Sequence, residues 1–308
     1  MSELADSIDI YETEILKQYP GVLELLLFDH TTQQNIYWAT DSYAERGAGF
    51  QFKDAILIEN ITGDNGLVIR PRSIKSKEEQ TRRSKNKAEV FTPSWICNSQ
   101  NNLIDEVWFG RKNVFNVEFP DNTWKTTTEN IIFPKGKSWK DYIRDTRLEI
   151  TCGKAPYLTS RYDTVTGMPI PLCERIGLLD RKLRVVSENT NTTGEFLKRC
   201  QDAYKNIYGY EWQGDNLLLA RESLLFTFID NYRAKFNKEP LLKSIKYIAY
   251  IISWNIWQMD GLKYSPPGSE PFEGDIFTPS NLCLIRDWRK PRKRQRIAFK
   301  SLLIDNCL

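Results

Sequence analysis

Three short segments, in a fixed order along the chain, constrain its fold more than any other feature. Residues 149–158 follow a short strand-like run and turn through Gly153; residues 208–211 end a second such run on Glu211; residues 255–260 end a third on Asp260. Parallel strands joined by helices place their carboxyl ends at one edge of a sheet, where doubly wound α/β proteins bind adenosine-containing cofactors. The order therefore predicts an α/β sheet with a ligand site at that edge.

The residue types in these segments suit such a site. Glu149 precedes the turn, Gly153 allows close approach of the backbone, and Tyr157 and Leu158 offer an apolar wall. Glu211 is an acceptor-only carboxylate that can bind the hydroxyls of a ribose. Each fragment alone also fits an ordinary glycine turn or a solvent-facing glutamate, and only the order favours the cofactor site.

The remaining chain is expected to form the elements around this core. Apolar runs at 22–28 and 35–40 around a polar turn predict an N-terminal β-hairpin, preceded by a helix over 5–18. Further helices are expected at 94–104, 194–206, 215–228 and 240–252, and irregular structure at 110–139. We expect residues 1–88 to be an N-terminal extension with the hairpin and a basic segment, and residues 89–308 to be the α/β domain with an insertion near 159–200.

Composition sets outer limits on the class of protein. Hydrophobic content of 41% and charged content of 27% are typical of a globular chain. Because no apolar run of about 20 residues is present, no membrane contact is expected. Six dispersed cysteines and the lack of a signal pattern favour a reducing cytoplasm. The single histidine, His30, excludes a histidine-rich metal site, no metal is predicted, and His30 is interpreted as a solvated turn residue.

Positive charge gathers in two segments, 70–87 and 286–300, of a chain with a net charge of only +3. Such runs are often merely solvated, but lysine and arginine also bind the phosphates of nucleic acids. We interpret both segments as DNA-binding, with these residues as the candidate phosphate contacts: Arg82, Arg83, Lys85, Arg292, Lys293 and Arg294.

These segments together resemble a known family. Residues 89–93 look like the Glu-(Val/Phe)-(Phe/Tyr)-Thr-Pro motif of adenine-N6 DNA methyltransferases of restriction–modification systems. Residues 149–158 resemble their Asp-Pro-Ala-Cys-Gly-Ser-Gly-x-Phe-Leu loop, and 208–221 their Gly-x-Glu strand with its Leu-Ala-Arg helix. Residues 255–262 are similar to their Asn-Ile-x-x-x-Asp-x-Leu stretch, and most of 22–300 is similar to proteins labelled restriction endonuclease subunit M.

The resemblance implies a Rossmann-like core that binds S-adenosylmethionine and acts on DNA, alone or with a separate restriction or specificity subunit. Its cofactor-binding residues would be Phe91, Thr92, Pro93, Glu149, Cys152, Gly153 and Glu211. Its candidate catalytic residues near the flipped base would be Asp260, Asp287 and Trp288.

Three departures from the family pattern leave the activity open. Ala155 and Pro156 replace the second glycine of the loop, and the gap between Gly153 and Glu211 is longer than one helix requires. The Asn/Asp-Pro-Pro-aromatic tetrapeptide is missing, since residues 265–268 hold the prolines without the amide or the ring. Only 48 residues follow Asp260, and we expect these to be too few for the remaining strands of such a core together with a target-recognition domain.

Three functions therefore compete. The leading one is an S-adenosylmethionine-dependent, adenine-specific DNA methyltransferase subunit. The second is a non-catalytic module that binds cofactor and DNA, or one half of a split enzyme that needs a partner chain. A Mg²⁺-dependent nuclease is the third, with only common acidic patterns in its favour.

Overall fold

A three-stranded parallel sheet joins the segments singled out in the sequence. The computed structural model describes residues 12–70, 92–269 and 281–304. Within them the sheet follows chain order, with β6 between its neighbours: β5 (Arg147–Glu149), β6 (Ile207–Glu211) and β7 (Ile256–Gln258). The three strands are confirmed where the sequence predicted them, and their carboxyl ends meet at one edge.

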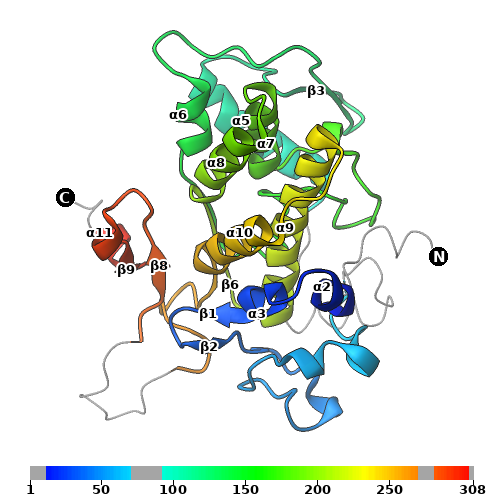
Figure 1. Cartoon of the computed structure of the whole chain (residues 1–308), viewed down its shortest axis with the longest axis vertical. Coiled ribbons are helices and arrows are strands. Elements are labelled where there is room, and N and C mark those ends of the chain that lie inside the picture. Colours follow the sequence, from blue (N-terminus) through cyan, green and yellow to red (C-terminus); the bar gives the residue numbers. More distant parts are fainter. Residues whose placement is uncertain (1–11, 71–91, 270–280, 305–308) are drawn as a thin grey trace.

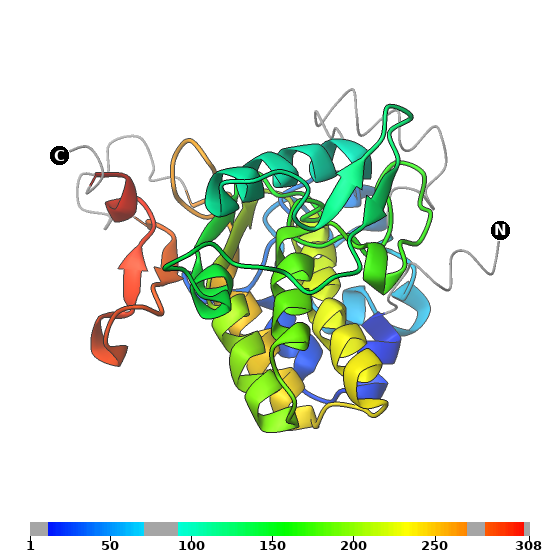
Figure 2. The same ribbon diagram turned by 90° about the horizontal axis from the view of Figure 1, so that it is seen from above.

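Helices cover one face of this sheet (Figures 1 and 2). Ile207 and Ile256 point to that face and are fully buried in the main hydrophobic core together with residues of the longest helices. The helices of this part of the chain are α5 (Ser94–Phe109), α6 (Trp139–Arg144), α7 (Leu178–Glu188), α8 (Thr193–Tyr204), α9 (Gly214–Phe236) and α10 (Leu242–Asn255). The helices predicted at 94–104, 194–206, 215–228 and 240–252 are thus confirmed, with shifted ends.

The C-terminal segment covers part of the opposite face. Successive side chains of a strand alternate between faces, so Tyr208 and Tyr210 point away from the helices. They pack with Trp257 against Ile285 and Phe299 in a second, smaller core. The elements there are β8 (Leu284–Arg286), β9 (Arg296–Ala298) and α11 (Ser301–Ile304), seen as the orange-to-red unit at the side of the molecule in Figure 1.

The predicted N-terminal β-hairpin is largely wrong. Residues 22–27 form a helix, and the strands that pair are only two residues each. Leucine is a strong helix former, and the four buried residues at 22, 23, 26 and 27 line one side of a helix rather than alternating as in a strand. The elements are α2 (Glu12–Gln18), α3 (Val22–Leu27), β1 (Phe28–Asp29) and β2 (Gln34–Asn35).

The N-terminal segment shares the main core with the predicted α/β domain. Leu23 and Leu26 of α3 are fully buried with Ile248 and Ile252 of α10. Buried Arg221 of α9 donates from Nη1 to the carbonyl oxygen of Leu26 at 2.5 Å and from Nε to that of Ile256 at 2.8 Å. The predicted boundary at residue 88 itself lies outside the described residues.

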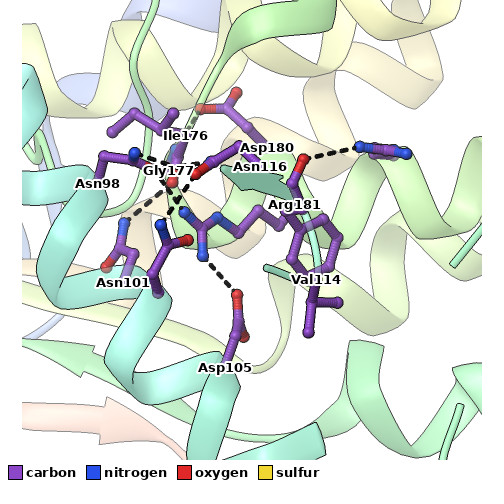
Figure 3. A network of polar contacts seen from close by, with 12 residues as sticks. Asn98, Asn101, Asp105, Val114, Asn116, Ile176, Gly177, Asp180 and Arg181 are labelled. Carbon is purple, nitrogen blue, oxygen red and sulfur yellow. Dashed lines mark hydrogen bonds and ion pairs between the residues drawn. The ribbon is translucent and has the colours of Figure 1, made fainter. Parts of the chain in front are cut away.

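The connection between β5 and β6 includes residues 159–200, where an insertion was predicted, and a buried polar network ties this connection to α5 (Figure 3). Arg181 of α7 donates to Asp105 at 2.6 Å and to Asn98 at 2.8 Å. Asn101 donates to the carbonyl oxygens of Tyr157 and Ile176, each at 3.0 Å. The segment 110–139, expected to be irregular, contains the paired strands β3 (Asn116–Glu118) and β4 (Trp124–Thr126). The network fixes the middle of α5 beside the loop that follows β5, since Asn101 bonds to the carbonyl oxygen of Tyr157.

Candidate functional site

The carboxyl edge of the parallel sheet is closed by the loop after β5. The backbone N–H of Gly153 donates to Glu211 Oε2 at 2.9 Å, and that of Cys152 donates to the carbonyl oxygen of Tyr210 at 2.8 Å. A side chain at Gly209 would come within 3.2 Å of the Cys152 sulfur, so the loop packs directly on the middle strand. The structure therefore brings together three predicted cofactor residues: Cys152, Gly153 and Glu211.

Glu211 is a buried acceptor at the end of β6. Burial raises the pKa of its carboxyl group, while N–H donation from Gln213 and Gly153 opposes that rise. The donation from Gln213 reaches Oε1 at 3.1 Å and that from Gly153 reaches Oε2 at 2.9 Å, and the backbone N–H of Trp212 is a third donor to this carboxylate. A carboxylate has about four acceptor positions, which leaves capacity for a hydroxyl donor.

Glu149 ends β5 in a similar setting. Burial raises the pKa of its carboxyl group, and hydrogen bonds from the backbone of Tyr157 and Leu158 act in the opposite direction. Its Oε2 atom is buried without a hydrogen-bond partner among the described residues. Burial also raises the pKa of the Cys152 thiol, and the carboxylates of Glu149 and Glu211 add to that rise. The thiol is therefore protonated and packs as a small apolar group.

The loop backbone adopts left-handed conformations at alternate residues. Thr151, Gly153 and Ala155 have φ values of 46°, 52° and 59°. Only glycine adopts this region without a steric penalty. Ala155, which aligns with the second glycine of the motif that residues 149–158 resemble, thus has a conformation that glycine favours.

The predicted Thr92 and Pro93 lie at the start of α5, next to this loop. The Tyr157 hydroxyl hydrogen-bonds to the side chain of Thr92. Thr164 Oγ1 donates to the carbonyl oxygen of Thr92 at 2.9 Å, and the backbone N–H of Ser94 donates to Asp163 Oδ2 at 2.7 Å. These contacts hold the segment against the loop. The predicted Phe91 lies outside the described residues.

The three candidate catalytic residues do not form one group. Asp260 follows β7 at the carboxyl edge, where its Oδ1 accepts the N–H groups of Leu262 at 2.8 Å and Lys263 at 3.1 Å. Trp288 lies toward the other end of that strand, because its Nε1 donates at 2.8 Å to Asn255, which precedes β7.

Asp287 adjoins Trp288 and has a structural partner of its own. It is bound by Arg289, with Nε to Oδ1 at 2.8 Å, and this hydrogen bond lowers the pKa of the Asp287 carboxyl group. The acid and the ring that were predicted to act together with Asp260 are therefore engaged elsewhere in the fold.

The candidate DNA contacts divide between described and undescribed residues. Arg292, Lys293 and Arg294 form an exposed 3₁₀ turn, η6, between β8 and β9. Arg82, Arg83 and Lys85 lie outside the described residues.

A cavity of about 470 Å³ adjoins the two prolines at 266 and 267. Tyr37 and Asn281 also line it, and they are residue types that the run 265–268 lacks. This grouping was not predictable from the prolines alone, because Tyr37 is far from them along the chain and Asn281 lies outside their run. The signal available was the tyrosine of the 35–40 run, which was interpreted only as part of a strand.

Comparisons with protein-family models, with curated proteins and with solved structures find no match. None of the helices in the described part of the chain has the length and apolar character to cross a membrane.

Proposed function

We propose that the protein is a DNA adenine-N6 methyltransferase-like subunit of a restriction–modification system that binds S-adenosylmethionine at the carboxyl edge of its parallel sheet. One observation carries the proposal: the Gly153 N–H lies 2.9 Å from Glu211 Oε2, which joins the loop after the first strand to the carboxylate that ends the second. That combination suits an adenosine ligand, since the loop backbone and the acid approach the same place.

The chain's own residues divide the work of binding. Glu211 would accept a ribose hydroxyl with the acceptor capacity that the backbone N–H groups of Gln213, Gly153 and Trp212 leave open. The Thr92–Tyr157 contact would limit the pocket at the methionine end, and Asp260, which follows β7 at the same edge, would face the adenine. S-adenosylmethionine, when bound, supplies the methyl group. The cavity beside Pro266 and Pro267 has room for a base at this edge.

A second function, a non-catalytic binding module or half of a split enzyme, is favoured by one specific observation. Asp260 accepts hydrogen bonds from its own turn, and Trp288 is bonded to Asn255 toward the opposite end of β7. No predicted acid-and-ring pair therefore faces the carboxyl edge among the described residues, and a partner chain would have to supply it. In that case the chain binds cofactor and DNA but needs another polypeptide for transfer.

One experiment addresses both functions. The purified chain is incubated with duplex DNA and S-adenosylmethionine tritiated in its methyl group, and label is counted separately on protein and in DNA. We expect retained label on the protein and only background in the DNA. No retained label would contradict the proposed function, whereas DNA label well above background would contradict the need for a partner and identify a complete enzyme.

A further inference from the structure

The C-terminal hairpin and α10 together form a surface of cations lying on aromatic rings. The Arg286 guanidinium lies 4.2 Å from the centre of the Trp288 ring and 5.6 Å from that of Tyr250. Lys205, at the end of α8, lies 5.5 Å from the Trp288 ring. We name the following set the cation–aromatic surface: Lys205, Tyr250, Trp254, Arg286, Trp288 and Arg296.

The side chains of this surface come from several elements and hold one another in place. Tyr250 and Trp254 are four residues apart on α10 and so lie on the same side of that helix. Arg286 of β8 donates from Nε to Gln295 Oε1 at 2.8 Å and from Nη1 to the Tyr250 hydroxyl. Arg296 of β9 lies 5.6 Å from the Trp254 ring. The guanidinium groups are therefore positioned before any ligand arrives.

The positive charge of this surface is not compensated by acids. Lys205, Arg286 and Arg296 form no ion pair with any described residue. The nearby Asp202 is already bound by Arg144 at 3.0 Å and by Arg199 at 2.9 Å. Asp287 is likewise bound by Arg289. The adjoining exposed turn η6 adds three more cations, Arg292–Arg294.

The aromatic rings of the cation–aromatic surface pack against its cations and do not present open faces to a ligand. Trp254 is only 5% exposed and is covered on one face by His30, whose ring lies 3.7 Å away. The Trp288 ring is covered by Arg286. Single-stranded nucleic acids bind through base stacking on open rings, whereas guanidinium groups match phosphates. The chemistry therefore fits the backbone of a duplex.

This surface lies at the end of the sheet away from the candidate cofactor site. Lys205 comes just before β6, and Trp288 is bonded to Asn255 just before β7. Glu211 ends β6, four residues after Ile207 at its start, which corresponds to about 13 Å of extended chain.

We propose that the cation–aromatic surface and η6 together bind the phosphates of duplex DNA at the amino end of the sheet, apart from the cofactor edge. The inference rests on the proposed function for its DNA partner and adds where the duplex lies. DNA held there is anchored at the end of the sheet opposite to the cofactor edge. A bound duplex thus leaves the cofactor site free.

The test is the salt dependence of binding to a fluorescent duplex of arbitrary sequence, about 20 base pairs long, measured by anisotropy from about 50 to 200 mM salt. The variant K205Q/R296Q removes two charges without breaking an ion pair. The control K125Q/K238Q removes two exposed charges from β4 and the end of α9. We expect the log–log slope of K205Q/R296Q to become shallower by about two, because each phosphate contact contributes about one. The control should keep the wild-type slope.

Different results would overturn the placement of the DNA and the proposal that the protein binds DNA at all. Wild-type binding to the duplex, with slopes unchanged in K205Q/R296Q and in a triple variant R292Q/K293Q/R294Q, would overturn the placement of DNA while leaving the DNA partner intact. Tighter binding to the single strand than to the duplex would overturn the duplex assignment. No binding by the wild type would refute the DNA partner as well. Retained cofactor binding by K205Q/R296Q would confirm that the variant is folded and that the two sites are separate.

Discussion

The side chain of His30 packs against other residues although His30 lies in a turn. Its ring stacks on Trp254 at 3.7 Å and is nearly parallel to it, and Nε2 lies 2.9 Å from Ser253 Oγ. Burial, with a smaller effect from Arg221 and other arginines, lowers the pKa of His30 from 6.5 to about 3. The side chain is therefore a neutral packing residue and not the solvated turn residue expected from the sequence.

The lowered pKa of His30 predicts a pH-dependent free energy of unfolding. Between about pH 6.5 and 3 the unfolded chain binds a proton that the folded chain does not, so stability falls as pH decreases through that window. The contribution is about 1.4 kcal/mol per pH unit. The free energy of unfolding of His30→Gln and of the wild type is measured with urea between pH 7 and pH 4. Below about pH 6.5 it should fall with decreasing pH by about 1.4 kcal/mol per pH unit less in His30→Gln than in the wild type. Parallel stability–pH curves for the two proteins would contradict the assignment.

At the level of elements, the local sequence pattern was sufficient to predict the secondary structure of some segments and insufficient for others. The strands around 147–149, 207–211 and 256–258 were predictable because short β-prone runs end at glycine or carboxylate positions. The run 22–27 was misassigned because continuous leucines suit a strand or a helix, and the contacts with α10 that decide between them are remote in sequence. The cavity with Tyr37 and Asn281 was unpredictable for the same reason.

The start of α9 illustrates such a remote contact and gives a prediction. The N–H of Gly214 donates to the carbonyl oxygen of Trp38 at 3.0 Å, and an added Cβ would lie 2.0 Å from the carbonyl oxygen of Tyr37. Gly214→Ala should therefore destabilise the protein by about 3 kcal/mol or more in chemical unfolding. Gly194→Ala in α8, where a Cβ meets nothing within 4 Å, should be neutral or stabilising by up to about 1 kcal/mol. Equal effects of the two substitutions would show that the Tyr37–Gly214 contact is not tight.

At the scale of the whole molecule, the two ends of the parallel sheet differ in chemistry. The carboxyl edge gathers buried acids, Glu149 and Glu211, under a loop whose backbone donates to Glu211. The amino end carries uncompensated cations, among them Lys205 and Arg286, on aromatic rings. The sequence indicated the acids and the basic run separately. It could not indicate that the sheet holds them apart, because that depends on Trp288 docking beside Asn255.

The central claim is that the carboxyl edge binds S-adenosylmethionine through Glu211, and calorimetric titration of the purified chain with this cofactor tests it most directly. We predict a measurable heat of binding for the wild type. Glu211→Ala should weaken the affinity about tenfold or more, because hydrogen bonds to a charged acceptor contribute about 1.5–3 kcal/mol. Glu174→Ala, at an exposed glutamate of the 3₁₀ helix Leu172–Glu174, should bind like the wild type. A wild-type chain that gives no heat at millimolar cofactor, or a Glu211→Ala variant that binds as tightly as the wild type, would contradict the claim.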